Sequence, residues 1–280
     1  MGGGRDFLTG QSIYIRKDGM YVRRDGKPVN RKTPSSLKNF TGNVNLANEQ
    51  YGYASESAKA MINEGLENIR EYINKSDFRI RVTNRAMNGI LDSGEIKNQM
   101  QVGSSGGAYN PEMRKELSRR MFDHDGNLED ADYEKYGYLS DGSTDAAYFY
   151  GDYDIVLKKD RMMDRTTMTL GDSLDYDVIY PSFVNNPQFI SNGDGLRTRI
   201  DRFAEDFLDK SRDLLNTGMF EDSYDGYAEL QFHGKVTIND IDHISMPRSW
   251  ADPDNRSYNV DLIIGRLNDR GIKVTFDAHD

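Results

Sequence analysis

The sequence predicts an α+β fold built on a mixed, mostly antiparallel sheet system. Its strand-like runs, in which apolar and polar residues alternate, are not separated by regularly spaced helices. This order excludes a doubly wound fold, in which strands and helices alternate along the chain. Only 36% of the 280 residues are hydrophobic, so we expect a lean core in which 17 tyrosines and 12 phenylalanines supply much of the packing.

The N-terminal part, residues 1–45, is predicted to be a basic hairpin followed by a linker. The run SIYIRKDGMYVRRDGKPV contains two alternating segments that turn at residues 17–19, a pattern typical of a β-hairpin. Residues 14–40 contain eight lysines and arginines and two aspartates, a balance of 8 − 2 = +6, so the rest of this −10 chain carries −16. A solvated hairpin with its linker and a phosphate-binding arm both fit this charge.

Residues 46–76 are predicted to connect this arm to the main domain, through a single helix from Leu46 to Asn74 with near-helical apolar spacing. A short strand should follow at 78–83. The next elements expected are a short helix with Asn84 as its N-cap and Gly94 as its stop, a glycine-serine loop at 103–110, and a helix opened by Pro111.

The second half of the chain is predicted to contain more strands than helices. Alternating runs indicate strands at 135–140, 152–159 and 165–170. A long polar loop should span 171–195, before an amphipathic helix at 197–216. The tail, residues 251–280, is expected to form an extension with one helix, stopped by Gly271, and a last strand.

Composition excludes several classes of site. The chain has no cysteine, so it cannot form disulfides or thiolate metal sites, and its four scattered histidines do not suggest a zinc site. The acidic run 123–134 has EF-hand-like offsets, but Gly126 and Leu128 stand in the wrong places, so we interpret it as a solvated acidic loop and expect no metal. No apolar run approaches the ~18 residues needed to cross a bilayer, so we expect a soluble, cytoplasmic protein without a membrane partner.

The stretch GYAELQFHGKVTINDI, residues 226–241, places polar chemistry on one face of a predicted strand. Alternation puts Tyr227, Glu229, Gln231 and His233 on one face and apolar residues on the other. A carboxylate on an inward face is costly unless it lines a wet cleft or pairs with a cation. An exposed edge strand with ordinary polar residues is the alternative interpretation.

Three blocks of the sequence together resemble an ADP-ribosyltransferase-like family of bacteria and phages. They read FRIRVTNRAMNGILDSGEIKNQ, YGDYDIVLKKDRMMDRTTMTLGDSL and YAELQFHGKVTINDIDHI. The resemblance covers about residues 77–245 and implies a domain at 77–250 with a split two-sheet fold and NAD bound as substrate between the sheets. In that family the first strand carries an NAD-contacting arginine or histidine, a middle strand supplies hydroxyls or aromatics, and a late strand supplies the catalytic glutamate.

The resemblance assigns roles to individual residues. Glu229 takes the catalytic position, and Arg81, with Arg79 as the alternative on the same face, takes the NAD-contacting position. Thr167 and Thr169 take the hydroxyl positions. Apart from the resemblance, the stacking chemistry of aromatic rings makes Tyr138 or Tyr148 a candidate to contact nicotinamide, and Gln231, on the face of Glu229, is a further substrate-binding candidate that with His233 could orient an acceptor. A fixed carboxylate suits this reaction because positive charge develops on the sugar as the nicotinamide–ribose bond breaks.

The resemblance departs from one pattern of the family. Arginine-modifying members carry a glutamate or glutamine two residues before the catalytic glutamate, where this chain has Tyr227. The departure argues against transfer to protein arginine. Nucleic acid, another protein side chain or water stay open as acceptors.

Three functions follow as hypotheses. The first is an NAD-consuming mono-ADP-ribosyltransferase of bacterial or phage origin, cytoplasmic or virion-associated, whose basic segment 14–40 docks on a macromolecular partner. The second is a noncatalytic phage structural or head-associated protein that uses the fold as a binding module. The third is a nucleic-acid-binding module led by the basic segment. A cleft between Arg81 and Glu229 would favour the enzyme, and a filled cleft would favour the noncatalytic protein.

Overall fold

The fold was obtained as a computed structural model. It describes residues 3–5, 12–15, 21–23, 34–37, 40, 42–104, 110–142, 147–174, 179–189, 196–220 and 226–278. Among the helices of these residues, none has the length and apolarity needed to span a membrane.

The main feature of the fold is one eight-stranded sheet in the order β13-β12-β7-β4-β6-β10-β8-β9. Its strands are β4 (Asp77–Val82), β6 (Lys135–Ser140), β7 (Tyr153–Leu157), β8 (Thr166–Leu170), β9 (Ile179–Phe183), β10 (Ala228–Phe232), β12 (Ile241–Pro247) and β13 (Lys273–Ala278). Only β12 and β13 pair in parallel, so the predicted mixed, mostly antiparallel sheet is confirmed.

The expected division of these strands into two separate sheets is not seen in the described part of the chain. Tyr138 of β6 pairs with Arg79 of β4 on one side and with Glu229 of β10 on the other. Hydrogen bonding therefore continues across the point at which two sheets would part. A small additional sheet joins β5 (Glu95–Ile96) to β11 (Val236–Thr237).

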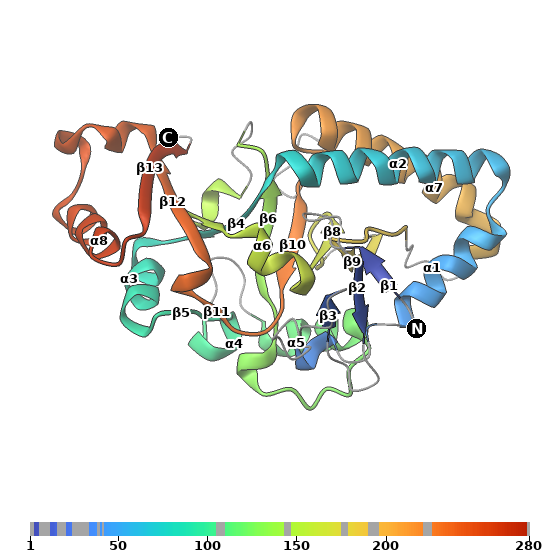
Figure 1. The fold of residues 1–280 in the computed structure, drawn as a ribbon, viewed down its shortest axis with the longest axis horizontal. Coiled ribbons are helices and arrows are strands. Elements are labelled where there is room, and N and C mark those ends of the chain that lie inside the picture. Colours follow the sequence, from blue (N-terminus) through green and yellow to red (C-terminus); the bar gives the residue numbers. More distant parts are fainter. Residues whose placement is uncertain are drawn as a thin grey trace.

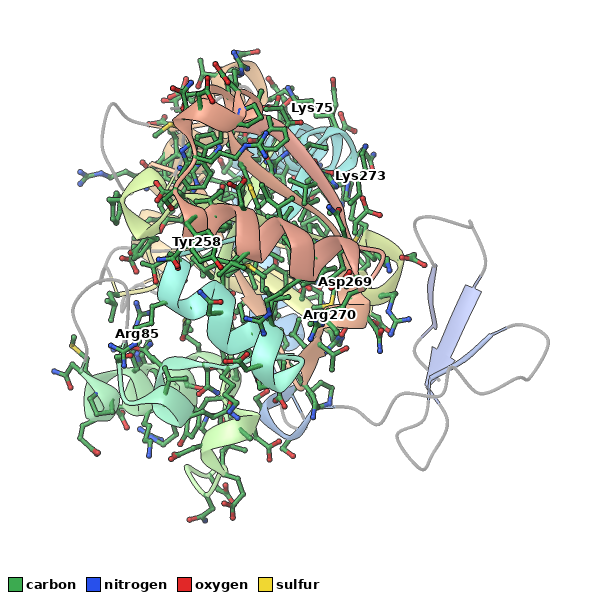
Figure 2. All side chains as sticks on the ribbon, turned by 90° about the vertical axis from the view of Figure 1, so that its left-hand side faces the viewer. Lys75, Arg85, Tyr258, Asp269, Arg270 and Lys273 are labelled. Carbon is green, nitrogen blue, oxygen red and sulfur yellow. The ribbon has the colours of Figure 1, made fainter. Side chains whose placement is uncertain are left out.

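The predicted N-terminal hairpin is confirmed by the antiparallel pairing of β2 (Ser12–Ile15) with β3 (Tyr21–Arg23). A further strand, β1 (Gly3–Arg5), pairs with β2 to give a three-stranded sheet. Figure 2 shows this sheet standing away from the main body. The predicted turn at 17–19 and the basic side chains of this sheet lie outside the described residues.

The single helix predicted from Leu46 to Asn74 is wrong: two helices are present, α1 (Gly42–Tyr53) and α2 (Glu56–Lys75). Ser55 ends the first run because its extended backbone and its side chain, which accepts a hydrogen bond from the amide of Ala58, make it the N-cap of α2. The Ser55 hydroxyl also donates to Asp201 on α7 (Leu196–Thr217) at 3.0 Å, which ties the break to the neighbouring helix.

Helices α2 and α7 pack side by side over the apolar face of the sheet (Figure 1). That face carries buried Ile80, Ile155 and Leu230, which join residues of both helices in the main core. The two helices approach closely at Gly65, where a Cβ atom would lie 2.6 Å from the Phe207 ring. The alternation seen in the sequence thus separates this core from a polar face on the other side of the sheet.

The helix at residue 84 was predicted correctly except at its start. In α3 (Asn84–Ser93) the N-cap is Thr83, whose side chain accepts from the amide of Ala86. The predicted stop is confirmed, since Gly94 has a left-handed backbone with φ 70°. The glycine-serine loop cannot be compared beyond Ser104, because 105–109 lie outside the described residues.

The remaining helices are α4 (Gln99–Val102), α5 (Pro111–Phe122), α6 (Lys159–Met162) and α8 (Tyr258–Asn268). The predicted helix at Pro111 is confirmed, with Asn110 as its cap. The tail also has its predicted helix and strand, α8 and β13. Figure 2 shows α8, between the labelled Tyr258 and Asp269, lying along α3, and Arg266 joins them by donating to Asn88 at 2.9 Å.

The long polar loop predicted at 171–195 is wrong in part, because β9 lies within it. Among the described residues, strand β9 forms the edge of the sheet and pairs with β8 alone, in which Thr167 is opposite Phe183. An edge position accommodates Pro181, which has no amide hydrogen to donate to a second neighbour. The proline in the middle of Ile179–Phe183 concealed this strand in the sequence, because proline disfavours a strand assignment.

Candidate functional site

The candidate site is a row of buried polar side chains on the face of the sheet opposite α2 and α7. Glu229 of β10 is paired in register with Tyr138 of β6 and Thr169 of β8, and Gln231 is paired with Thr167 of β8. Paired residues point to the same face, so these five side chains form two adjacent rows. All five are buried, with Glu229 only 3% exposed. The structure therefore brings together Glu229 and Gln231, which alternation places on one face, with Thr167, Thr169 and Tyr138, which the resemblance or its chemistry suggested.

Glu229 is held by two donors. Its Oε1 accepts a hydrogen bond from Gln231 Nε2 at 2.9 Å and from the backbone amide of Ser173 at 3.3 Å. Burial, aided by the charge of Asp172, raises the pKa of Glu229 to about 7, while Arg114 and these two donors oppose the rise. A carboxyl group with this pKa can exchange a proton near neutral pH or stabilise a nearby positive charge.

Hydrogen bonds fix the orientation of Gln231, and through it that of Glu229. Gln231 donates to Thr169 Oγ1 at 3.1 Å and accepts from Thr167 Oγ1 at 2.9 Å. Thr167 Oγ1 also lies 2.9 Å from Nε2 of His233, the residue that directly follows β10. The two threonines thus orient the glutamine that contacts Glu229, a preorganised arrangement in which each polar group has a partner.

Arg114 of α5 is the cation near Glu229, and the sequence did not single it out. Its guanidinium lies over the ring of Tyr136, 4.5 Å from the centroid, and donates to the hydroxyl of Ser173 at 3.2 Å. Its charge acts on Glu229, whose pKa it lowers against the effect of burial. Its Nε is buried and has no hydrogen-bond partner among the described residues. No pattern along the chain links position 114 to a strand more than 100 residues away.

The two arginines expected to contact NAD lie on the same face, on β4, but Arg79 is engaged elsewhere. It donates to Asp154 at 2.7 Å and to Asp77 at 3.0 Å, and its side chain is 12% exposed. Arg81, which pairs in register with Asp154, is half-buried. Both arginines lie on one face of β4, as the alternation of the sequence predicts.

Aromatic residues lie close to the row of Glu229. Tyr138 and Tyr227 meet edge to face, with ring centroids 6.1 Å apart, and Tyr150 packs against this cluster. Burial, with the charge of Asp154, raises the pKa of Tyr138 well above its usual value, so this tyrosine stays protonated. The side chain of Tyr148, the other tyrosine expected to stack on nicotinamide, lies outside the described residues.

A second polar cluster extends the site beyond His233. Ser118 of α5 donates to Glu134 at 2.8 Å and lies 3.0 Å from Nε2 of His124, while Ser36 Oγ lies 2.9 Å from Nδ1 of His233. All five side chains are buried. Burial raises the pKa of Glu134 to about 7 and lowers that of His233 well below its usual value. The interpretation of 123–134 as a solvated acidic loop is therefore wrong for His124 and Glu134, which face the sheet.

The next feature is the arrangement of the side chains that carry oxygen or nitrogen atoms around Glu229 and His233. Among the described residues, no group of three or more histidine, aspartate or glutamate side chains could hold a metal ion. The described side chains around Glu229 offer hydrogen bonds, a carboxyl group with a raised pKa and the charge of Arg114.

Comparison with known proteins adds no assignment. No protein-family model matches the chain, and no curated protein matches it in sequence.

Proposed function

We propose that the protein is an NAD-dependent mono-ADP-ribosyltransferase in which Glu229 is the catalytic carboxylate. The observation that carries this proposal is the setting of Glu229: it is buried on the polar face of a central strand, bonded to Gln231, and has a pKa of about 7. Further support is that β4, β6 and β10 are neighbours in the sheet. These strands carry an arginine, aromatic side chains and a glutamate, respectively. The resemblance requires these side chains to contact one ligand.

The proposed chemistry needs few groups from the protein. As the bond between nicotinamide and the ribose C1′ breaks, its electron pair leaves with nicotinamide and positive charge develops on the sugar. The Glu229 carboxylate stabilises this charge, and its fixed orientation by Gln231 avoids a reorganisation cost. The acceptor then attacks C1′ and loses its proton, which Glu229 can accept. Tyr227 favours an acceptor other than protein arginine.

The residues proposed to bind NAD differ in how well their surroundings suit that role. Arg81 is the proposed phosphate or ribose contact, because it takes the NAD-contacting position in the resemblance and a guanidinium suits a phosphate; Arg79, the alternative, is paired with Asp154 and Asp77. Tyr138 lies beside Glu229 and can stack on nicotinamide. Thr167 and Thr169 bond to Gln231, so we propose that they position the site.

Access to the site requires a local rearrangement. Glu229 is 3% exposed, and the amide of Ser173 lies against its carboxylate. We propose that NAD reaches Glu229 when residues 171–174 move. Such a movement breaks the bonds of Ser173 with Glu229 and Arg114 and the bond of Thr169 with the carbonyl of Gly171, and it separates Leu174 from the apolar cluster that contains Phe122.

The same burial favours a second candidate function from another class, a noncatalytic binding module. If residues 171–174 do not move, the polar face is filled, and the ion pair of Arg79 with Asp154 serves only stability. This candidate predicts no chemical change in NAD. It is also the form in which the protein would act as a phage structural or head-associated component.

The pH dependence of activity should follow the pKa of Glu229. The carboxylate form is the active one, and it becomes dominant as pH rises through about 7, so activity should rise over that range. Arg114→Met removes a charge that lowers this pKa and should move the rise to higher pH by roughly one unit. Arg114→Lys keeps the charge and should move it less. Identical profiles of NAD cleavage for the wild type and Arg114→Met would contradict this coupling.

Transfer of a label from NAD tests the proposed function and identifies the acceptor class. The purified protein is incubated with NAD labelled on the adenylate phosphate and with a bacterial lysate. Label that becomes macromolecular with the wild type but not with Glu229→Gln supports the proposal. Protease or nuclease treatment then assigns the acceptor to protein or nucleic acid. Absence of label with both proteins, together with intact NAD, favours the noncatalytic module.

A further inference from the structure

The N-terminal linker does not simply connect the basic arm to the domain; part of it lies on the polar face. Ser36, in the short helix η1 (Ser35–Leu37), is fully buried, and its hydroxyl lies 2.9 Å from Nδ1 of His233, 197 residues away in the chain. Leu37 and Phe40 are buried as well, 5% and 2% exposed. A linker with no role in the domain would leave such side chains in solvent.

Apolar contacts anchor this segment to the elements beside the site. The Phe40 ring lies 5.4 Å from that of Phe122 on α5 and 5.1 Å from that of Phe183 on β9. Leu37 and Phe40 share a cluster with residues of α5 that is separate from the main core, and Leu174 packs against it. The segment thus packs against α5 and β9, within a cluster against which Leu174 also packs.

Leu174 links this cluster to Glu229. The adjacent Ser173 donates its amide to Glu229 Oε1 at 3.3 Å and accepts from Arg114 of α5 at 3.2 Å. Residues 173 and 174 therefore lie between the cluster on one side and the carboxylate on the other. Any change that removes Leu37 and Phe40 from the cluster also removes support from the residues that close off Glu229.

We propose that residues 34–37 and 40, here called the cover, regulate access to Glu229 by holding residues 173 and 174 over it. The cover is the C-terminal part of the basic segment 14–40, so a partner that binds that segment acts directly on it. This proposal rests on the proposed function for its consequence in catalysis. The exposure of Glu229 tests the closure itself whether or not NAD is cleaved.

The first test measures how fast Glu229 reacts with a carbodiimide and an amine, followed by mass spectrometry, in the full chain. Phe40→Ala should increase the labelling of Glu229 at least about tenfold, because opening of 173 and 174 becomes easier. Phe189→Ala is the matched control, since Phe189 is equally buried but packs on Phe207 in the main core. Equal labelling of Glu229 in the two variants would overturn the proposal.

Ser36→Ala guards against a Phe40 variant that fails to fold. It removes only the hydroxyl that contacts His233 and should increase Glu229 labelling in the same direction by a smaller factor. Labelling that is unchanged in a folded Ser36→Ala protein and unchanged in Phe40→Ala would show that the cover does not control exposure.

A reversible disulfide should hold the cover closed, which is the opposite of the effect expected for Phe40→Ala. A Cβ atom placed on Gly234 would lie 3.7 Å from Cβ of Pro34, within the range of a disulfide, and the chain has no other cysteine to interfere. In the double variant Pro34→Cys, Gly234→Cys, the oxidised form should label Glu229 several times more slowly than the reduced form. Because Gly234 has φ 71°, the comparison is made within the same variant, which cancels the strain of a cysteine there.

Nicotinamide release, measured on the same variants, separates the two proposals. Faster release and faster labelling in Phe40→Ala support both. Faster labelling without release from any protein keeps the cover and overturns the enzymatic proposal. Release that depends on Glu229 with labelling unchanged in Phe40→Ala keeps the enzyme and overturns the cover.

Discussion

Replacing Gly137 with alanine should lower the free energy of unfolding by about 3 kcal/mol or more. A Cβ atom on Gly137 would lie 2.1 Å from the backbone carbonyl oxygen of Arg79 and 2.7 Å from the ring of Phe232. The first of these atoms belongs to the backbone of the neighbouring strand, so it cannot turn away as a flexible side chain would. Strand β4 must move from β6 to relieve the clash.

A displacement of β4 from β6 also affects the candidate site, because β6 lies between β4 and β10, the strand that carries Glu229. Chemical denaturation followed by circular dichroism measures the effect. Gly89→Ala on α3 is the matched control: nothing lies within 4 Å of its Cβ position, and alanine in a helix should stabilise by about 0.5–1 kcal/mol. Similar stabilities for the two variants would show that β4 and β6 are not packed as closely as described.

The stability of the protein should also depend on pH through Glu134. Its pKa is raised from 4.5 to about 7, chiefly by burial, against the charges of Lys135 and Arg114. A carboxyl group whose pKa is higher in the folded state contributes stability that is fully present below its unfolded pKa and lost as pH rises through its folded pKa. The window is therefore pH 4.5 to 7, and a shift of this size corresponds to about 3 kcal/mol.

Glu134→Gln isolates this contribution, since glutamine keeps an acceptor for Ser118 and does not titrate. Relative to the wild type, the variant should become more stable by about 3 kcal/mol between pH 5 and pH 8. The comparison with the variant is needed because two histidines also titrate. His233 and His124 have lowered pKa values, so their contribution to the stability of the folded state decreases as pH falls, whereas that of Glu134 increases. Urea denaturation at both pH values provides the measurement. A stability difference that does not change with pH would contradict the burial of an ionisable Glu134.

The local features of the fold were predictable from the sequence because they leave a local pattern. Alternation identified the strand at residue 228 and placed Glu229 and Gln231 on one face, opposite Leu230. The stop at Gly94 was predictable because its left-handed backbone favours glycine. A proline at its centre concealed β9, and helical spacing alone did not reveal that Ser55 caps a new helix.

The surroundings of Glu229 were not predictable because they are contributed by distant segments. Ser173 is 56 residues away from Glu229, and Ser36 is 197 residues away from His233. Polar residues in loops and on an amphipathic helix are ordinarily solvated, so their side chains carry no sign of such partners. Only the sheet register and the packing of α5 decide that Arg114, rather than Arg79, provides the charge beside Glu229.

Release of nicotinamide from NAD by the purified protein tests whether Glu229 is the catalytic carboxylate. The wild type is compared with Glu229→Gln and with Glu134→Gln, a matched control because both carboxyl groups are buried on the same polar face and have pKa values of about 7. We expect the wild type to release nicotinamide. The rate of release should fall about 100-fold or more in Glu229→Gln and change little in Glu134→Gln. Equal release by all three proteins, or no release together with no NAD binding by calorimetry, would contradict a catalytic role for Glu229.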